Sequence, residues 1–439
     1  MNKKIGVWAL LPIGVFLIVY LGLGIFFTYG LGKTMGFYEV PIVVAFMFAL
    51  GVACLQTRGM KAEEKIRTMA EGVGDANIMT MLLIFLLAGV FVGVVGRSSA
   101  QSVAYFMLSF VPAQFSVCVL FLISCFVSTA MGTSVGTITL IVPIAVAVSE
   151  ATGFDMALCV GTVMGGAMFG DNLSFISDTT IAVCNGQGCN MRDKFKTNFF
   201  VVLPAAIVTI VLLLILSMQT EVGNFAAGEY DLLQTIPYIL VLIGGVCGVN
   251  VFLLLVCGIF VGGTIMLATG TCDFYTLIGN TGSGAAGMFE TAMVTILVSA
   301  MCALIRKNGG FDALLRGIKR VFRGKGGGQL GMGLLVGAMD IATANNTVAI
   351  VMANPIAKEI SEEYGISPRK TASILDTFSC IFQGILPYGA QMLVALSAVS
   401  ELGYALSAFS VISYMLYPLL LLVSSLVFMF LIPERKEKA

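Results

Sequence analysis

The sequence predicts an all-α polytopic membrane protein, built from inverted-topology repeats with broken helices. The chain of 439 residues is 58% hydrophobic and 11% charged, with a mean hydropathy of +0.99. Soluble domains carry about 25% charged residues, so this composition excludes an ordinary soluble protein. Apolar stretches recur throughout, and a stretch of about 20 residues spans a bilayer as a helix. We expect about 10 transmembrane helices and two re-entrant hairpins.

The repeat is visible as two stretches of sequence whose landmarks keep a constant spacing of 212 residues. Pro143 corresponds to Pro355, and a polar break at Asp171 corresponds to one at Gln383. Apolar segments interrupted by polar residues, at matching places in two halves of a chain, point to the binding site of a secondary transporter. This pattern therefore predicts transport of ions or small solutes.

Residues 1–76 should form two N-terminal transmembrane helices, at about 7–27 and 40–55. Cytoplasmic loops carry an excess of Lys and Arg, so the chain starts inside at Lys3. A third helix, at about 77–96, then leads the chain outside.

Residues 77–217 should form the first repeat. Lys194 and its basic neighbours should lie inside, yet two apolar blocks precede them, at about 115–149 and 156–184. Two single crossings would place these basic residues outside. Residues 115–149 are therefore predicted to form a hairpin entered from outside, with its tip at 131–134.

Residues 218–286 should be connecting helices around a turn at 248–250, and residues 287–439 the second repeat. The predicted parts of this repeat are a helix at 287–305, a basic inner loop at 306–325, a hairpin entered from inside at 330–358, a broken helix at 371–399 and a last helix at 409–432. The glycine-rich residues 324–328 should be a flexible connector. One hairpin opens outward and its repeat inward, an architecture of alternating-access carriers. This path predicts an inner (plasma) membrane protein with both termini in the cytoplasm.

The sharpest candidate site is the segment GDNLSFISDTT, residues 170–180. It places two carboxylates, an amide and four hydroxyls in an apolar stretch, where an uncompensated charge costs about 2.5–3.5 kcal/mol. Hard oxygen ligands of this kind suit Na⁺ or a similar cation, and Asp171 or Asp178 could also carry a proton. The candidate ligands are Asp171, Asn172, Ser174, Asp178 and Thr179, of which Asp171, Ser174 and Asp178 are the proposed Na⁺ ligands. The alternative is that the hydroxyls and amides only join helices.

Further candidates lie at the hairpin tips and in the second half of the chain. They are Thr133, Ser134, Asn345, Asn346 and Thr347 at the tips, with Asp340, Asp376 and Gln383 in the second repeat. The tip residues are natural N-caps, and the positive end of a half-helix can face an anion or a carboxylate. Capping alone is the alternative role. Asp376 could instead pair with Arg369 or Lys370.

The segment 170–180 resembles the GD-x-x-SPLSDTT signature of NhaC-type Na⁺/H⁺ antiporters, in the ion-transporter superfamily. The resemblance implies that Asp171 and Ser174 contribute to an ion site, with Asp178 and Thr179 close to it. Phe-Ile at 175–176 replaces the usual Pro-Leu, which indicates a divergent branch. Relatives of this kind include proteins assigned as amino-acid transporters.

The sequence therefore predicts a secondary active transporter, a sodium/proton antiporter that works by alternating access. The alternative is a Na⁺- or H⁺-coupled transporter of a small solute such as an amino acid. The near-absence of Lys and Arg deep in the spans argues against a strongly anionic substrate. We expect no enzymatic activity, no cofactor and, at a formal net charge of zero, no nucleic-acid partner. The chain has no histidine, so carboxylates, or else Lys, Cys or Tyr, must carry protons.

The expected partners are the lipid bilayer, Na⁺ and H⁺, with a small zwitterionic solute under the alternative. Carriers of this fold type are often dimers, so a homodimer stays open.

The inverted repeat makes a direct prediction about sidedness. Cysteines introduced at Lys319 and Glu229 should react with a membrane-impermeant reagent from opposite sides, Lys319 from the cytoplasm and Glu229 from outside. Reaction of both from one side would contradict the inverted arrangement.

Overall fold

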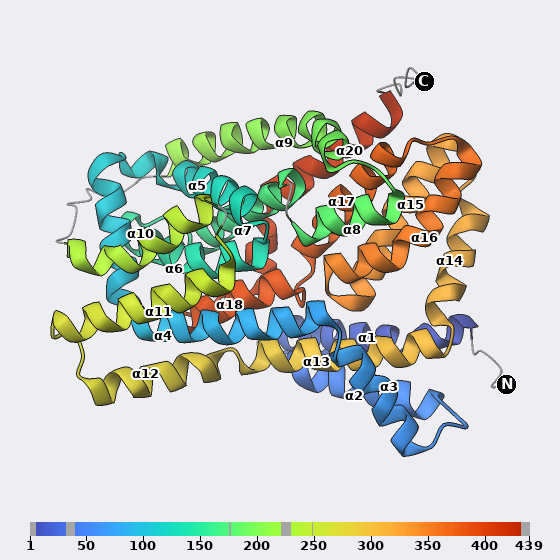
Figure 1. Ribbon diagram of the computed structural model, residues 1–439, viewed down its shortest axis with the longest axis horizontal. Helices are drawn as coiled ribbons and strands as arrows, with labels where there is room; N and C mark the ends of the chain where they lie inside the picture. The colour runs from blue at the N-terminus through green and yellow to red at the C-terminus, as the bar shows by residue number, and fades with distance from the viewer. Residues whose placement is uncertain (1–5, 32–39, 175–176, 221–229, 248, 432–439) are drawn as a thin grey trace.

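The computed structural model describes residues 6–31, 40–174, 177–220, 230–247 and 249–431, and every regular element among them is helical (Figure 1). The first part of the chain contains α1 (Leu11–Ile25), α2 (Ile42–Gln56), α3 (Ala62–Val73), α4 (Ala76–Phe110), α5 (Ser116–Met131), α6 (Ser134–Thr152), α7 (Met156–Leu173), α8 (Asp178–Gln187) and α9 (Met191–Gln219). The rest contains α10 (Leu232–Val246), α11 (Val251–Ala268), α12 (Phe274–Gly287), α13 (Phe289–Lys307), α14 (Gly310–Val321), α15 (Gly324–Thr343), α16 (Asn346–Tyr364), α17 (Pro368–Ile385), α18 (Ala390–Glu401), α19 (Ala408–Ser413) and α20 (Leu416–Leu431).

Seven helical stretches among the described residues are long and apolar enough to cross a membrane. A further pair, Ser98–Phe110 and Ala113–Thr129, is bent by 113° and could form one broken span. Three shorter apolar helices, α2, α10 and α20, accompany them. The predicted class, an all-helical multi-pass membrane protein, is confirmed.

The two predicted hairpins are present, as α5–α6 and α15–α16. Each turns on a residue in the left-handed region, Gly132 at φ 72° and Ala344 at φ 51°. The next residue caps the following helix: Thr133 Oγ1 accepts the Gly136 N–H at 3.3 Å, and Asn345 Oδ1 accepts the Val348 N–H at 2.9 Å. The same turn is therefore built twice, with its tips at the predicted places.

Two broken helices face these hairpins. The first is α7–α8, and the chain is extended at Ser174, where φ is −73° and ψ is 142°. The second is α17–α18, broken at Pro387, a residue that cannot continue a helix. In Figure 1 the hairpins lie at opposite ends of the molecule, with α7, α8, α17 and α18 between them.

Some sequence predictions were wrong in detail. Residues 324–328 are the first turns of α15 rather than a flexible connector. Gly328 lies against Tyr364 and Ile360 of α16, so the missing side chain permits close helix packing that outweighs its low helix propensity. The helix predicted at 287–305 is present as α13, and α12 precedes it, so the two helices together form the apolar stretch Phe274–Lys307.

Other differences are additions to the predicted path. Helix α4 continues beyond Gly96, where φ is 65°, and α3 is a helix in the predicted basic loop. The last predicted helix is divided into α19 and α20. The predicted external residues Glu221 and Glu229 lie outside the described residues.

Close packing of α5 on α7 fixes where the first break begins. A Cβ atom added at Gly170 would overlap Ser128 of α5. We expect Gly170→Ala to destabilise the protein by about 1–3 kcal/mol, because a well-packed site has no room for the methyl group. Gly51→Ala in α2 is the matched control, since nothing lies within 4 Å of the added atom. Thermal unfolding of both variants in detergent tests this, and equal melting temperatures would contradict it.

Candidate functional site

A cavity of about 50 Å³ lies where the two hairpin tips meet the two helix breaks. Nine of the residues predicted from the sequence line it: Thr133, Ser134, Asp171, Asp178, Thr179, Asn345, Asn346, Thr347 and Gln383. The structure thus brings together side chains from both repeats, such as Thr133 and Asn345, which lie 212 residues apart in the sequence. Four other predicted residues, Asn172, Ser174, Asp340 and Asp376, do not line this cavity.

Asp171 is the buried carboxylate of the cavity, with 3% of its surface exposed. Its Oδ1 accepts the backbone N–H of Ser134 at 3.0 Å, in the first turn of α6. The unpaired N–H groups at a helix N-terminus carry partial positive charge, so this contact stabilises a negative side chain. Ser134 Oγ in turn accepts a hydrogen bond from Gln391 Nε2 of α18 at 2.6 Å. The first tip therefore joins Asp171 to the second repeat.

Gln383 occupies the repeat position that corresponds to Asp171. Its Nε2 donates to the carbonyl of Ala344 at the second tip, at 3.2 Å. Its Oε1 has no hydrogen-bond partner among the described residues, and the same is true of Gln391 Oε1. Each broken helix thus binds its own hairpin tip, one through a carboxylate and one through an amide.

Hydroxyl groups hold the first break open beside the cavity. Ser177 caps α8 by accepting the Thr180 N–H at 3.2 Å, and it donates to the Asp171 carbonyl at 3.0 Å. Thr180 donates to the Ser174 carbonyl at 2.9 Å. Asp178, the first residue of α8, is exposed and lines the cavity. Ser174 is buried away from the cavity, so among the three predicted Na⁺ ligands only the two aspartates line it.

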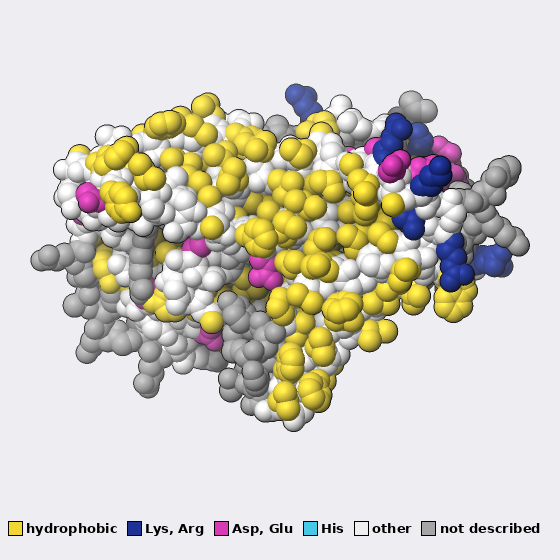
Figure 2. Space-filling model, turned by 90° about the horizontal axis from the view of Figure 1, so that it is seen from below, with side chains coloured by type: hydrophobic (Ala, Val, Ile, Leu, Met, Phe, Trp, Pro, Cys, Tyr) yellow, Lys and Arg dark blue, Asp and Glu magenta, His cyan; other side chains and the backbone are white. Residues whose placement is uncertain are grey.

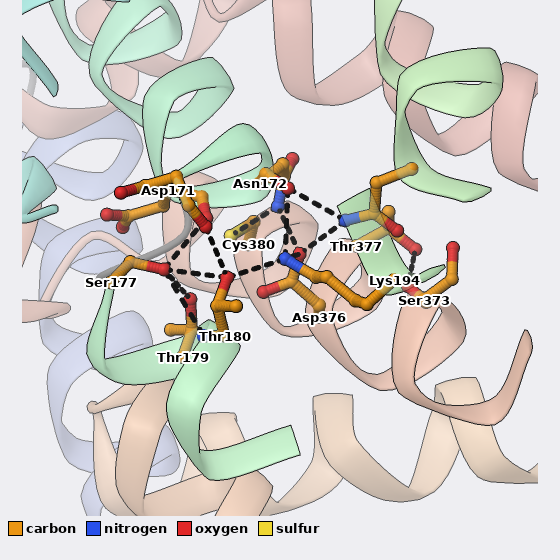
Figure 3. A network of polar contacts seen from close by, with 12 residues as sticks. Asp171, Asn172, Ser177, Thr179, Thr180, Lys194, Ser373, Asp376, Thr377 and Cys380 are labelled. Atoms are coloured by element: carbon orange, nitrogen blue, oxygen red, sulfur yellow. Dashed lines mark hydrogen bonds and ion pairs between the residues drawn. The ribbon is translucent and has the colours of Figure 1, made fainter. Parts of the chain in front are cut away.

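Behind the break lies a buried ion pair between Lys194 of α9 and Asp376 of α17 (Figure 3). The Lys194 Nζ and Asp376 Oδ2 atoms are 2.8 Å apart, and the side chains are 1% and 0% exposed. Lys194 also donates to the Asn172 carbonyl at 2.9 Å and to Thr180 Oγ1 at 2.7 Å. Lys194 therefore lies in α9 rather than in the predicted loop, and it is an exception to the near-absence of Lys and Arg deep in the spans. Asp376 pairs with Lys194, not with Arg369 or Lys370.

Asn198 and Asn172 complete this cluster. Asn198 Nδ2 donates to Asp376 Oδ2 at 2.7 Å and to the Asn172 carbonyl at 2.9 Å. Asn172 Nδ2 donates to Asp376 at 3.2 Å and to Cys380 Sγ at 3.0 Å, while its Oδ1 accepts from the Tyr417 hydroxyl at 3.1 Å. Adjacent residues at the end of α7 thus have different places: Asp171 faces the cavity and Asn172 faces the ion pair.

Asp340 lies five residues before the second tip. Unlike Asp171 it does not line the cavity, and unlike Asp376 it is not paired with Lys194. Its side chain is fully buried, and neither carboxylate oxygen has a hydrogen-bond partner among the described residues.

The sequence profile of the Na⁺/H⁺ antiporter family matches residues 7–218 and 232–432. The chain belongs to the Na⁺/H⁺ antiporter family. This confirms the resemblance seen in residues 170–180 and supports cation/proton antiport by a multi-pass membrane protein.

Several relatives of this chain are named as antiporters. The Na⁺/H⁺ antiporter NhaC of Bacillus subtilis (strain 168) is 22% identical over 361 residues, 74% of this chain and 79% of the relative. The malate-2H⁺/Na⁺-lactate antiporter of the same organism is 23% identical over 216 residues, 48% of this chain and only 46% of the relative. The arginine/ornithine antiporter ArcD of Halobacterium salinarum (strain ATCC 700922 / JCM 11081 / NRC-1) is 21% identical over 356 residues, 73% of each chain.

A solved structure, the YdaH transporter of Alcanivorax borkumensis, aligns with a TM-score of 0.42 and 13% identity, over 81% of this chain and 89% of that one.

Sequence reasoning missed Lys194, Asn198, Gln391 and Tyr417 in this antiporter-family site. One signal was present: Lys194 and Asn198 are four residues apart, so they share one face of a helix. Such a polar pair on an otherwise apolar helix favours a buried contact.

Removing one member of the ion pair should destabilise the protein strongly. Lys194→Met leaves Asp376 buried without its counter-charge, a change that costs about 3–5 kcal/mol in buried pairs. The double variant Lys194→Met with Asp376→Leu should be less destabilised than the sum of its single variants. Lys196→Met, two residues along α9 and exposed, is the control. Thermal unfolding of the purified proteins provides the measurement, and additive single effects would contradict coupling.

Proposed function

We propose that this protein exchanges a monovalent cation, Na⁺ in the simplest case, for protons, with Asp171 as the carboxylate that both ions use. The observation that carries the proposal is the small central cavity, in which Asp171 lies beside amide oxygens that have no partner among the described residues. Family membership supports the same reaction class.

The volume of the cavity favours an inorganic ion. At about 50 Å³ it holds a dehydrated cation with one or two water molecules, since a water occupies about 30 Å³ in the liquid. Pockets for organic ligands are usually about 300–1,000 Å³. An amino acid would need a much larger space than this conformation provides.

The chemistry of the lining favours a hard cation. Carboxylate, hydroxyl and amide oxygens suit such ions, and Asp171, Thr133, Thr179 and Gln383 supply all three kinds. Among the described residues of the lining, only Asp171 and Asp178 add negative charge. One carboxylate that binds either a proton or a cation gives exchange directly, because the two ions compete for the same oxygens.

The two hairpins support alternating access as part of this proposal. Their tips reach the cavity from different repeats, and each is hydrogen-bonded to the broken helix of its own repeat. Opening one tip while the other stays closed would expose Asp171 to one side at a time. We place both termini in the cytoplasm, in keeping with the distribution of basic residues.

Coupled transport of a small organic solute is the second candidate. It rests on the relatives named as malate/lactate and arginine/ornithine antiporters. In that case the central cavity must widen when the solute binds, which inorganic ion exchange does not require.

Asp171→Asn should abolish Na⁺-driven proton movement while the protein still folds and inserts. The amide keeps the shape of the side chain but has neither a negative charge nor a titratable proton. Proteoliposomes with an internal pH dye and no organic solute provide the measurement, with Asp193→Asn, an exposed residue of α9, as control. Near-normal exchange in the variant would overturn the role of Asp171. Exchange that requires an added amino acid or organic acid would instead favour the second candidate.

Na⁺ should stabilise the purified protein, and more so as the pH rises. A protonated Asp171 cannot hold the cation, so acidification should weaken the effect. A ligand at a hundredfold excess over its Kd adds about 2.7 kcal/mol to the free energy of unfolding. Thermal shifts in Na⁺ and K⁺ at several pH values test this, and Asp171→Asn should reduce the shift. Curves that respond neither to Na⁺ nor to pH would contradict a sodium site.

A further inference from the structure

A second hollow lies where α4, the α12–α13 junction and α18 meet. It consists of two adjoining cavities of about 580 Å³ and 250 Å³, which share Gly287, Ser397 and Ser400. We call these two cavities together the groove. It is more than ten times larger than the central cavity, so it has room for hydrated ions.

Apolar side chains such as Val92, Leu396 and Leu406 line much of the groove, and polar and acidic side chains lie among them. Ser283 and Asn280 of α12 face Ser397, Ser400 and Glu401 of α18 across it. Neither carboxylate oxygen of Glu401 has a hydrogen-bond partner among the described residues. A desolvated carboxylate without a partner is costly, and binding either a proton or a cation stabilises it.

The small residues around Glu401 keep this site open. Its carboxylate lies against Gly287, where a Cβ atom would overlap it. Glu290, in the first turn of α13, is exposed and lines the smaller of the two cavities. The groove therefore has two carboxylates, one half-buried and one in contact with solvent.

The groove lies in the half of the membrane spans that is farther from Arg306 and Lys307. The stretch Phe274–Lys307 has 34 residues and ends in Arg306 and Lys307. Met288, next to Gly287, lies against Gly89, seven residues before the end of the span Ile78–Gly96, so the groove starts in the half of this span that ends at Gly96. Asp273, just before α12, is exposed, and hydrogen bonds from Thr276 lower the pKa of its carboxyl group.

The basic side chains mark the other end. Figure 2 shows a broad apolar surface whose Lys and Arg side chains gather toward one end of the molecule. The span Ile78–Gly96 reaches the groove at Gly96, and Pro368–Glu401 reaches it at Glu401 after starting beside basic residues. Since positive residues mark the cytoplasmic side, the groove opens on the outer side.

Helix α18 connects the groove to the central cavity. Gln391 lines the central cavity, whereas Ser397 and Glu401 line the groove. Between them lies a void of about 10 Å³, which shares Asn345 with the central cavity and Leu393 with the groove. Leu393 is thus one of the apolar side chains that separate the two spaces, together with Val294 and Val298, which also line the void.

We propose that the groove is the outer vestibule of the ion path, where Glu401 binds the hydrated cation before it passes Leu393 toward Asp171. This inference rests on the proposed function. An acidic cleft raises the local concentration of cations and their rate of entry, so Glu401 should govern the apparent affinity for external Na⁺.

Glu401→Gln should raise the KM for external Na⁺ by about tenfold at low ionic strength and leave kcat unchanged. The difference should shrink at high choline chloride, because salt screens the carboxylate. The KM for Na⁺ from the cytoplasmic side should not change. Glu362→Gln, at an exposed glutamate of α16, is the matched control. An unchanged external KM, or the same rise from both sides, would overturn the vestibule.

A labelling experiment tests the location without relying on exchange. Ser400→Cys should react with a membrane-impermeant thiol reagent from outside, whereas Ala398→Cys, buried on the same helix, should not. The wild-type protein gives the background from its own cysteines. An unreactive Ser400→Cys would overturn the proposal, because lipid or a second copy of the chain would then cover the groove. Failure of the proposed function would be detected in a different experiment, because the Asp171→Asn variant would then retain Na⁺-driven proton movement.

Discussion

The ion pair between Lys194 and Asp376 is the contact on which the central site depends. Helix α7 ends with unsatisfied carbonyl groups next to Asp171, and a buried helix end of this kind needs partners. Lys194 and Asn198 both donate to the Asn172 carbonyl, and both also bind Asp376 of the second repeat. The break in one repeat is therefore fixed by an acid of the other. Asp171, the neighbouring residue, is directed into the cavity because Asn172 is held from behind.

The repeats share their geometry but not their charges. Asp171 accepts an N–H from its hairpin tip, whereas Gln383 donates to a carbonyl of the other tip. The pair Asp171 and Gln383 carries one negative charge rather than two, and Asp178, exposed at the start of α8, is the other carboxylate among the described residues that line the cavity. A single monovalent cation or a single proton neutralises Asp171. This asymmetry agrees with the exchange proposed here.

The sequence predicts the parts of this protein that depend on local chemistry. Hairpin tips at Thr133 and Asn345 follow from N-cap residues, and the breaks follow from polar residues and Pro387. Their convergence on one cavity follows from the repeat. Lys194 could not be placed in this way, because the orientation rule treats every lysine as a surface marker, whereas burial depends on a partner far away in the sequence. Residues 324–328 were assigned wrongly for a similar reason, since packing against Tyr364 decides their structure.

The sizes of the two hollows indicate where a transported ion would lose its water. A groove of about 580 Å³ can hold an ion with its hydration shell, and a cavity of about 50 Å³ cannot. Dehydration must therefore take place between Glu401 and Asp171, at Leu393, where the void shrinks to about 10 Å³. The cost is offset only if protein oxygens replace the lost water. The amide oxygens of Gln383 and Gln391 have no hydrogen-bond partner among the described residues. Both side chains line the central cavity, where these oxygens can replace the lost water. Because these oxygens have no hydrogen-bond partner among the described residues, they are available to coordinate a cation that has lost most of its water.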